Sequence, residues 1–73
     1  MKIINVENIY IENHPKYICL YYKDKIYVII MERISYRDFI FYYHSDTIPD
    51  EKTKEEIESF LYEEFLDYEK WNI

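Results

Sequence analysis

The hydrophobic pattern of this 73-residue chain changes its period once, near residue 46. Before that point apolar and polar residues alternate in short runs, as they do on the two faces of β-strands. After it, apolar residues recur every three or four positions, which is the spacing of one helix face. The charge changes there too, because residues 1–45 hold five acids and six Lys or Arg, whereas residues 46–73 hold ten acids and three Lys. The sequence therefore predicts a near-neutral sheet followed by a strongly acidic helix.

Four segments of the N-terminal part have the pattern of strands. They are 2–12 (as one strand or a broken pair), 17–22, 26–32 and 39–44. Residues 26–31 are apolar throughout, so the third segment is expected to be the central strand. Asp24 or Lys25 is expected to take the left-handed conformation in a short hairpin loop. The predicted fold class is α+β: a three- or four-stranded antiparallel meander, followed by one C-terminal helix packed across one sheet face.

The helix is predicted to start at Thr53, because Thr53 and Glu56 have the spacing of a capping box and Pro49 ends the preceding segment. Side chains that share one helix face at 100° per residue are expected to close the core over the sheet. They are Ile57, Phe60, Leu61, Phe65, Tyr68 and Trp71.

Glu64 falls within this apolar stripe and is a separate case. A buried carboxylate is costly unless it is paired. Glu64 is therefore expected to reach the sheet edge and meet Arg33, Arg37 or a tyrosine hydroxyl. A catalytic acid with a raised pKa is the alternative, and no constellation of partner residues in the sequence favours it.

The side of the helix away from this stripe has the pattern of an interface. Tyr62 and Leu66 lie four residues apart, nearly opposite the stripe, with acids on both sides of them. One acidic row is Glu56, Glu63 and Asp67, and the other is Glu55, Glu58 and Glu69. Apolar anchors inside a charged rim are typical of protein interfaces. The alternative is an acidic face that only keeps the protein soluble.

The chain has ten tyrosines, more than a core this small can supply with hydrogen-bond partners. Alternation places Tyr17 and Tyr21 on one strand face, and it places Tyr42 and Tyr43 on opposite faces. These four form a second candidate surface. Cations are expected near it: Lys16, Lys23, Lys25, Arg33 and Arg37. Such a surface could stack single-stranded bases, but the net charge of −6 disfavours phosphates, so a protein partner or a homodimer is preferred.

No pattern indicates catalysis or metal binding. The chain has no Gly, which excludes the usual phosphate-cradling loops. His14, Cys19 and His44 are the only soft metal ligands, and their spacing matches no metal site. His44, Ser45 and Asp46 are triad residue types, but adjacency in sequence does not create triad geometry. We therefore expect neither an enzyme nor a cofactor.

Length and cysteine content restrict the class of protein. Seventy-three residues make one domain, 1–73, in which 1–45 form the sheet and 46–73 a loop and the helix. A single Cys19 cannot form an intramolecular disulfide and fits a reducing compartment, so a cytoplasmic location is expected. No signal-peptide core is visible, and the apolar run at 26–31 is too short to span a bilayer. We expect no membrane association.

The residue usage points to an AT-rich genome. There is no Gly and no Ala, while Ile, Tyr, Lys, Phe and Asn, whose codons are AT-rich, make up about half the chain. A low-GC bacterium or its phage is therefore expected. The preferred function is a protein-binding module for a basic partner, in its narrowest form an inhibitor that occupies the nucleic-acid-binding surface of a host defence enzyme or nuclease. The alternatives are a structural or regulatory homo-oligomer and a single-strand nucleic-acid binder.

Overall fold

The computed structural model describes residues 1–9, 15–35 and 37–66. Its elements are β1 Lys2–Asn8, β2 Lys16–Tyr22, β3 Lys25–Arg33, β4 Phe39–Tyr43, the 3₁₀ helix η1 Ser45–Thr47, and α1 Glu51–Phe65. The strands form one antiparallel sheet in the order β1-β2-β3-β4. The predicted α+β meander with one C-terminal helix is confirmed, with four strands rather than three.

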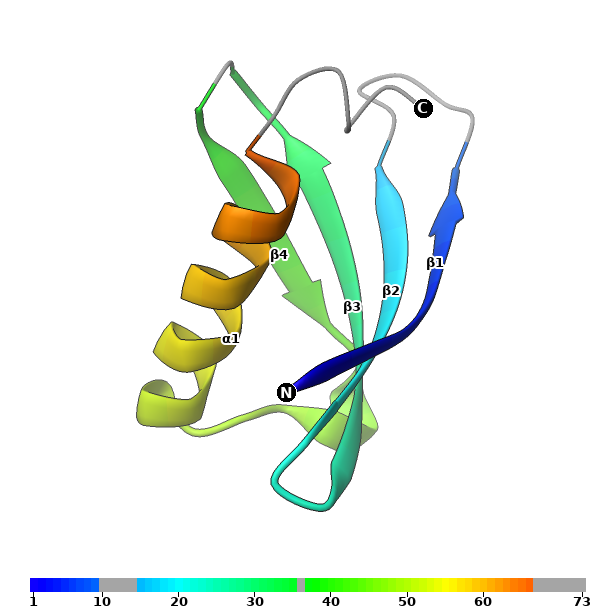
Figure 1. Ribbon diagram of the computed structural model, residues 1–73, viewed down its shortest axis with the longest axis vertical. Coiled ribbons are helices and arrows are strands. Elements are labelled where there is room, and N and C mark those ends of the chain that lie inside the picture. The colour runs from blue at the N-terminus through cyan, green and yellow to red at the C-terminus, as the bar shows by residue number, and fades with distance from the viewer. Residues whose placement is uncertain (10–14, 36, 67–73) are drawn as a thin grey trace.

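The helix lies across one face of this sheet. In Figure 1, α1 runs alongside β3 and β4, while β1 forms the opposite edge of the sheet. We call the sheet face toward α1 the inner face and the other the outer face. The core consists of inner-face and helix side chains that are at most 8% exposed: Ile18, Leu20, Tyr27, Ile29, Met31, Phe39, Ile57, Leu61 and Phe65. The helix stripe predicted from the sequence supplies three of them, while Phe60 is only partly buried, and Tyr68 and Trp71 lie outside the described residues.

A two-residue turn joins β2 to β3. Lys23 and Asp24 both have positive φ, at 53° and 61°. This pair of conformations suits the right-handed twist of hairpin strands, although each costs a non-glycine residue about 1 kcal/mol. The Tyr21 hydroxyl donates a hydrogen bond to Asp24 Oδ1 at 3.0 Å and helps to hold the turn. The prediction for Asp24 is confirmed, but Lys25 is the first residue of β3, and Lys23 takes the other left-handed position.

The helix begins earlier than the sequence pattern predicted. Asp50 is the N-cap, and its Oδ1 accepts a hydrogen bond from the Thr53 backbone N–H at 2.8 Å. This hydrogen bond lowers the pKa of the Asp50 carboxyl. The capping box expected at Thr53 is therefore wrong. An aspartate directly after Pro49 accepts from one of the free N–H groups of the first turn, so the helix can start at Glu51.

The C-terminal end of α1 receives a cation from the sheet. The last turn of the helix contains no basic residue. Arg33 Nη2, at the end of β3, donates to the carbonyl oxygens of Phe65 at 2.9 Å and Leu66 at 3.3 Å. A guanidinium at this end stabilises the partial negative charge of the helix terminus. The charge that the helix sequence lacks locally is therefore supplied by tertiary structure.

Among the described residues, no helix is both long enough and apolar enough to cross a membrane.

Candidate functional site

The outer face of the sheet carries a group of apolar side chains that the helix does not cover. Strand register assigns its side chains to successive rows across the sheet. They are Lys2, Asn5 and Glu7 from β1, Tyr17, Cys19 and Tyr21 from β2, Ile26, Val28, Ile30 and Glu32 from β3, and Ile40 and Tyr42 from β4. The prediction that Tyr17 and Tyr21 lie on the same face of their strand is confirmed.

Several of these apolar side chains are in contact with solvent. Tyr21 is 43% exposed, Ile26 52%, Ile40 37% and Tyr42 49%, whereas Ile29 on the inner side of the same sheet is fully buried. Contiguous exposed apolar surface on a small protein usually marks an interaction site. The outer face is therefore the first candidate for a functional surface.

A small hollow lies near the centre of this face. Tyr17, Ile30 and Tyr42 are paired across β2, β3 and β4 and form one row. Together with neighbouring residues they surround a volume of about 110 Å³. The residues that line this outer hollow are Tyr17, Val28, Ile30, Tyr42, Tyr43 and His44. Apolar cavities of roughly this size hold small hydrocarbon groups, because an engineered cavity of about 150 Å³ accepts benzene.

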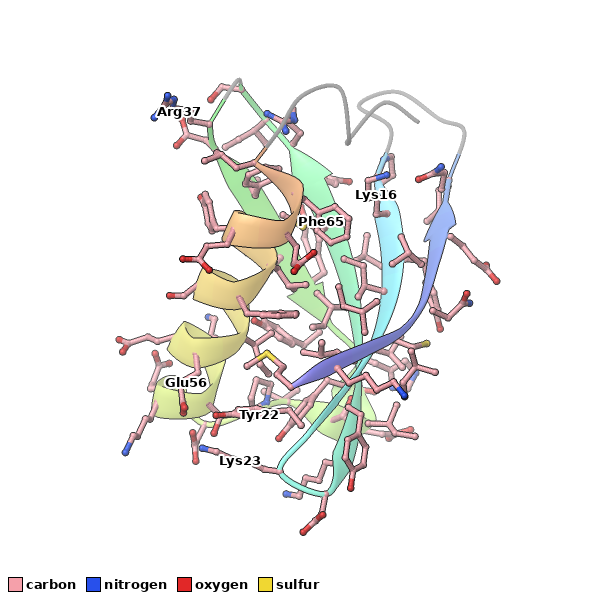
Figure 2. The ribbon with its side chains drawn as sticks, viewed as in Figure 1. Lys16, Tyr22, Lys23, Arg37, Glu56 and Phe65 are labelled. Carbon is pink, nitrogen blue, oxygen red and sulfur yellow. The ribbon has the colours of Figure 1, made fainter. Side chains whose placement is uncertain are left out.

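The cations expected around the sheet tyrosines are not on the outer face, and this part of the sequence interpretation is wrong. Lys16 is buried on the inner side, with its Nζ 2.6 Å from Asn8 Oδ1 and 5.7 Å from the centre of the Phe65 ring. Figure 2 shows Lys16 and Phe65 at the same end of the molecule. Burial lowers the pKa of this lysine. Arg33 is also buried, where it caps α1.

The remaining cations lie beside the helix or in a turn. Lys23 contacts α1, and Lys25 lines a separate hollow at the start of the helix, of about 400 Å³, together with Asp50 and Thr53. Arg37 is in the connection between β3 and β4 (Figure 2). At the outer-face positions of the four strands, the charged residues are Lys2, Glu7 and Glu32. This face is therefore slightly acidic, which is unfavourable for phosphate contacts.

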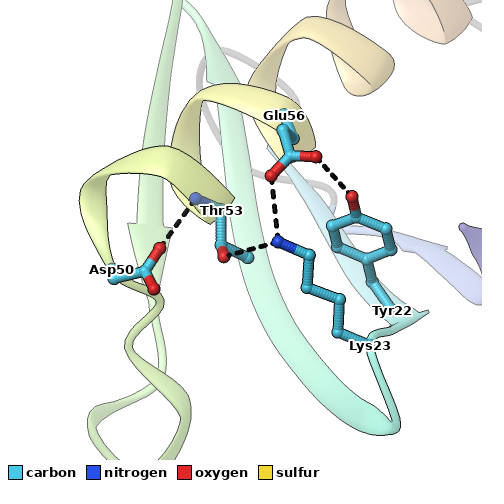
Figure 3. Close-up of polar contacts among 5 residues, drawn as sticks. All are labelled: Tyr22, Lys23, Asp50, Thr53 and Glu56. Carbon is cyan, nitrogen blue, oxygen red and sulfur yellow. Dashed lines mark hydrogen bonds and ion pairs between the residues drawn. The ribbon is translucent and has the colours of Figure 1, made fainter.

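Glu56, predicted to be a free acid on the helix surface, joins α1 to the β2–β3 hairpin (Figure 3). Its Oε2 accepts a hydrogen bond from the Tyr22 hydroxyl at 2.5 Å, and its Oε1 lies 3.0 Å from Lys23 Nζ. Lys23 Nζ also donates to Thr53 Oγ1 at 3.3 Å. The hydrogen bonds from Tyr22 and Lys23 lower the pKa of the Glu56 carboxyl, and the same contacts raise the pKa of Tyr22 and of Lys23.

Glu58, which we also assigned to the acidic rim, has a structural partner as well. The Tyr43 hydroxyl donates to Glu58 Oε2 at 2.6 Å. Burial, together with this hydrogen bond, raises the pKa of the Tyr43 phenol. Tyr43 therefore points to the inner face, while Tyr42 is exposed on the outer face, as alternation predicted.

Tyr62 is not the exposed anchor that the helix pattern predicted. Its ring packs edge-on against Phe39, with centroids 4.9 Å apart, and lies 5.8 Å from the ring of Phe41. Its hydroxyl accepts a hydrogen bond from the Phe39 N–H at 3.3 Å. The helix lies against β4, so the flank that carries Tyr62 contacts the sheet and is only partly exposed. Helical periodicity does not specify how much of each flank the sheet covers.

The other residues of the predicted helix surface divide into exposed and undescribed positions. Glu55 and Glu63 are exposed, and Leu66 is 39% exposed. Asp67 and Glu69 lie outside the described residues. Of the four predicted acids that the structure describes, Glu55 and Glu63 are therefore exposed, and Glu56 and Glu58 are partly buried.

Glu64 is half-buried, and it has an interaction partner. Arg33, one of its expected partners, donates to backbone carbonyls at the end of α1. The expected pairing of Glu64 with Arg33, Arg37 or a tyrosine stays a prediction.

The described residues offer little chemistry beyond these contacts. No three His, Cys, Asp or Glu side chains in this part of the chain are grouped so that they could hold a metal ion. Cys19 is a free, half-buried thiol on the outer face.

No family model, curated protein or solved structure matches this chain.

One sequence pattern predicts the exposed outer face. Residues 26–31 are apolar at every position, which we interpreted only as the mark of a central strand. The register shows that alternate members of this run face away from α1. A continuous apolar run in a sheet that has only one helix therefore predicts an exposed apolar face.

Proposed function

We propose that this protein is a small acidic protein-binding module whose outer sheet face docks onto a basic partner protein. The observation that supports this is the exposed outer face, in which Tyr21, Ile26 and Tyr42 are each more than two-fifths exposed on a protein of net charge −6. Aromatic and aliphatic anchors supply the contact energy of an interface, and the surrounding charge selects the partner and speeds association.

The acids of the helix have a supporting role in this proposal. Glu55 and Glu63 are exposed, so they add to the negative field around the protein. Glu56 and Glu58 contribute less to recognition because they are engaged by Tyr22, Lys23 and Tyr43. In its narrowest form, the proposal is an inhibitor that covers the nucleic-acid-binding surface of an enzyme, where its carboxylates take the place of phosphates.

A homodimer is the second candidate, and the same exposed face favours it. Two copies of net charge −6 repel each other by roughly 1 kcal/mol after screening at physiological salt. This repulsion disfavours self-association, whereas a basic partner gains from the charge.

Selection of peptides from a random displayed library against the immobilised protein tests this function. We expect enriched peptides that combine Leu, Ile or aromatic residues with Lys or Arg, and we expect their affinity to fall as salt is raised. The double variant Tyr21→Ser, Tyr42→Ser should abolish binding, and the helix variant Leu66→Ser should leave it unchanged. The proposal fails if no basic peptide is enriched, or if only Leu66→Ser or charge reversal at Glu55 and Glu63 weakens binding.

A further inference from the structure

The outer hollow is a concave and mainly apolar part of the outer face. It is lined mainly by Tyr17, Val28, Ile30 and Tyr42, on three adjacent strands. The strands hold these side chains in fixed positions because each is paired with its neighbour through the backbone. A concave apolar site on a rigid sheet is the type of pocket that holds one anchor residue of a partner.

The volume selects the size of that anchor. About 110 Å³ is less than the benzene-sized cavity described above, and it suits one aliphatic side chain. Ile26 and Ile40, elsewhere on the outer face, are exposed.

Carboxylates lie on several sides of the outer hollow. Glu7 is paired with Tyr17 across β1 and β2, so it is the next position in the same row. Glu32 lies two residues beyond Ile30 on the same strand and the same face. Asp46 lies next to His44, which lines the hollow, and Asp46 Oδ2 is 3.6 Å from His44 Nδ1. These acids are complementary to basic residues that flank an aliphatic anchor.

We propose that the outer hollow is an anchor pocket for one Leu, Ile or Met side chain of the basic partner, carried on a segment with Lys or Arg on both sides of the anchor. This inference rests on the function proposed above. It commits to a basic protein segment as occupant, because both a second copy of this chain and a nucleic acid bring negative charge toward the carboxylates around the hollow.

A matched pair of variants tests the pocket. Val28→Phe places a ring in the outer hollow, whereas Ile48→Phe adds a ring at an exposed aliphatic position between η1 and α1, outside the outer face. With a peptide from the library selection, we expect Val28→Phe to raise the Kd about 10-fold or more, and Ile48→Phe to change it less than about 3-fold. Far-UV circular dichroism and thermal unfolding of both variants control for folding.

A double-mutant cycle identifies the contact itself. Replacing the aliphatic anchor of the peptide by Ala should weaken binding to the wild-type protein about as much as Val28→Phe does, and should cause little further loss with the variant. Fully additive losses, or equal losses from Val28→Phe and Ile48→Phe, would overturn the pocket while the docking face still stands. Failure to enrich any basic peptide would instead overturn the proposed function.

The competing occupants have separate readouts. Sedimentation equilibrium of the free protein would overturn the inference if it showed a dimer that Val28→Phe dissociates. Fluorescence titration with single-stranded oligonucleotides at low salt would overturn it if tyrosine quenching occurred and was lost in the same variant. We expect a monomer and no quenching.

Discussion

The two faces of the sheet use similar residues with different results. On β3, Ile29 and Met31 are completely buried beneath α1, while Ile26, on the other face of the same strand, is 52% exposed. On β4, Tyr43 donates a hydrogen bond to a helix carboxylate, and its neighbour Tyr42 faces solvent. The difference comes from the single helix, which covers only one side. The residue type therefore does not predict whether a side chain is buried here. The strand face on which it lies does.

Shortening single side chains of β3 to Ala tests the difference between the two faces and should give the largest effect. Ile29→Ala leaves a cavity in the core and should lower the free energy of unfolding by about 3 kcal/mol. This is a large share of the roughly 4–11 kcal/mol expected for a domain of this length. Ile26→Ala, on the outer face, should cost less than about 1 kcal/mol. Urea unfolding measures both, and similar losses would contradict the distinction between the faces.

Removal of the guanidinium that joins the sheet to the helix should have the next largest effect. Arg33→Met keeps an apolar side chain of similar length but leaves the carbonyls of Phe65 and Leu66 without this donor. We expect a loss of about 2 kcal/mol and a lower helical signal in circular dichroism. Lys2→Met, at the exposed start of β1, is the control, and an equal effect there would argue against the capping role of Arg33.

The adjacent tyrosines of β4 provide a smaller, matched test. Tyr43→Phe removes the hydroxyl that donates to Glu58, and it should cost about 0.5–1 kcal/mol because the contact is only partly shielded from solvent. Tyr42→Phe should leave unfolding unchanged within about 0.5 kcal/mol. Thermal unfolding at neutral pH compares the two. A larger loss for Tyr42→Phe would mean that the outer face has a structural role.

The smallest expected effect is a change in acid sensitivity. The folded state lowers the pKa of Glu56, so its contribution is present above the unfolded pKa, near about 4, and is lost as pH falls through the lower folded value. Glu56→Gln should therefore reduce the Tm at pH 7 and flatten its decline below about pH 4. Glu55→Gln, an exposed control, should leave the decline unchanged, and an identical profile for both variants would contradict the assignment.

The opposite direction applies to the phenols that donate to helix carboxylates. The pKa of Tyr22 and of Tyr43 is raised in the folded state, so their contributions are complete below the unfolded value, near about 10, and decrease above it. Stability is therefore expected to decline at both ends of the pH range. The two declines come from the contacts that join α1 to the inner face.

The acidic surface of the helix could be predicted only in part. Glu55 and Glu63 are exposed, as their positions on the helix indicated, but Tyr62 packs on Phe39 and Glu56 is bound by Tyr22 and Lys23. Angular position on a helix is a local property. The extent to which a neighbouring strand covers each flank depends on where the helix crosses the sheet, and no local pattern contains that information.

Local sequence patterns specify the set of elements and their order. Alternation and helical spacing are consequences of backbone geometry, so they can be read without knowledge of distant contacts. They gave the meander, the C-terminal helix, the opposite directions of Tyr42 and Tyr43, and the core positions Ile57 and Leu61. Which sheet face α1 covers depends on tertiary packing. So do the burial of Lys16 and Arg33 on the inner side and the capping of the helix by Arg33 from β3. Arg33 and Phe65 are 32 positions apart, and their contact follows from the packing of one helix on one side of a four-stranded sheet.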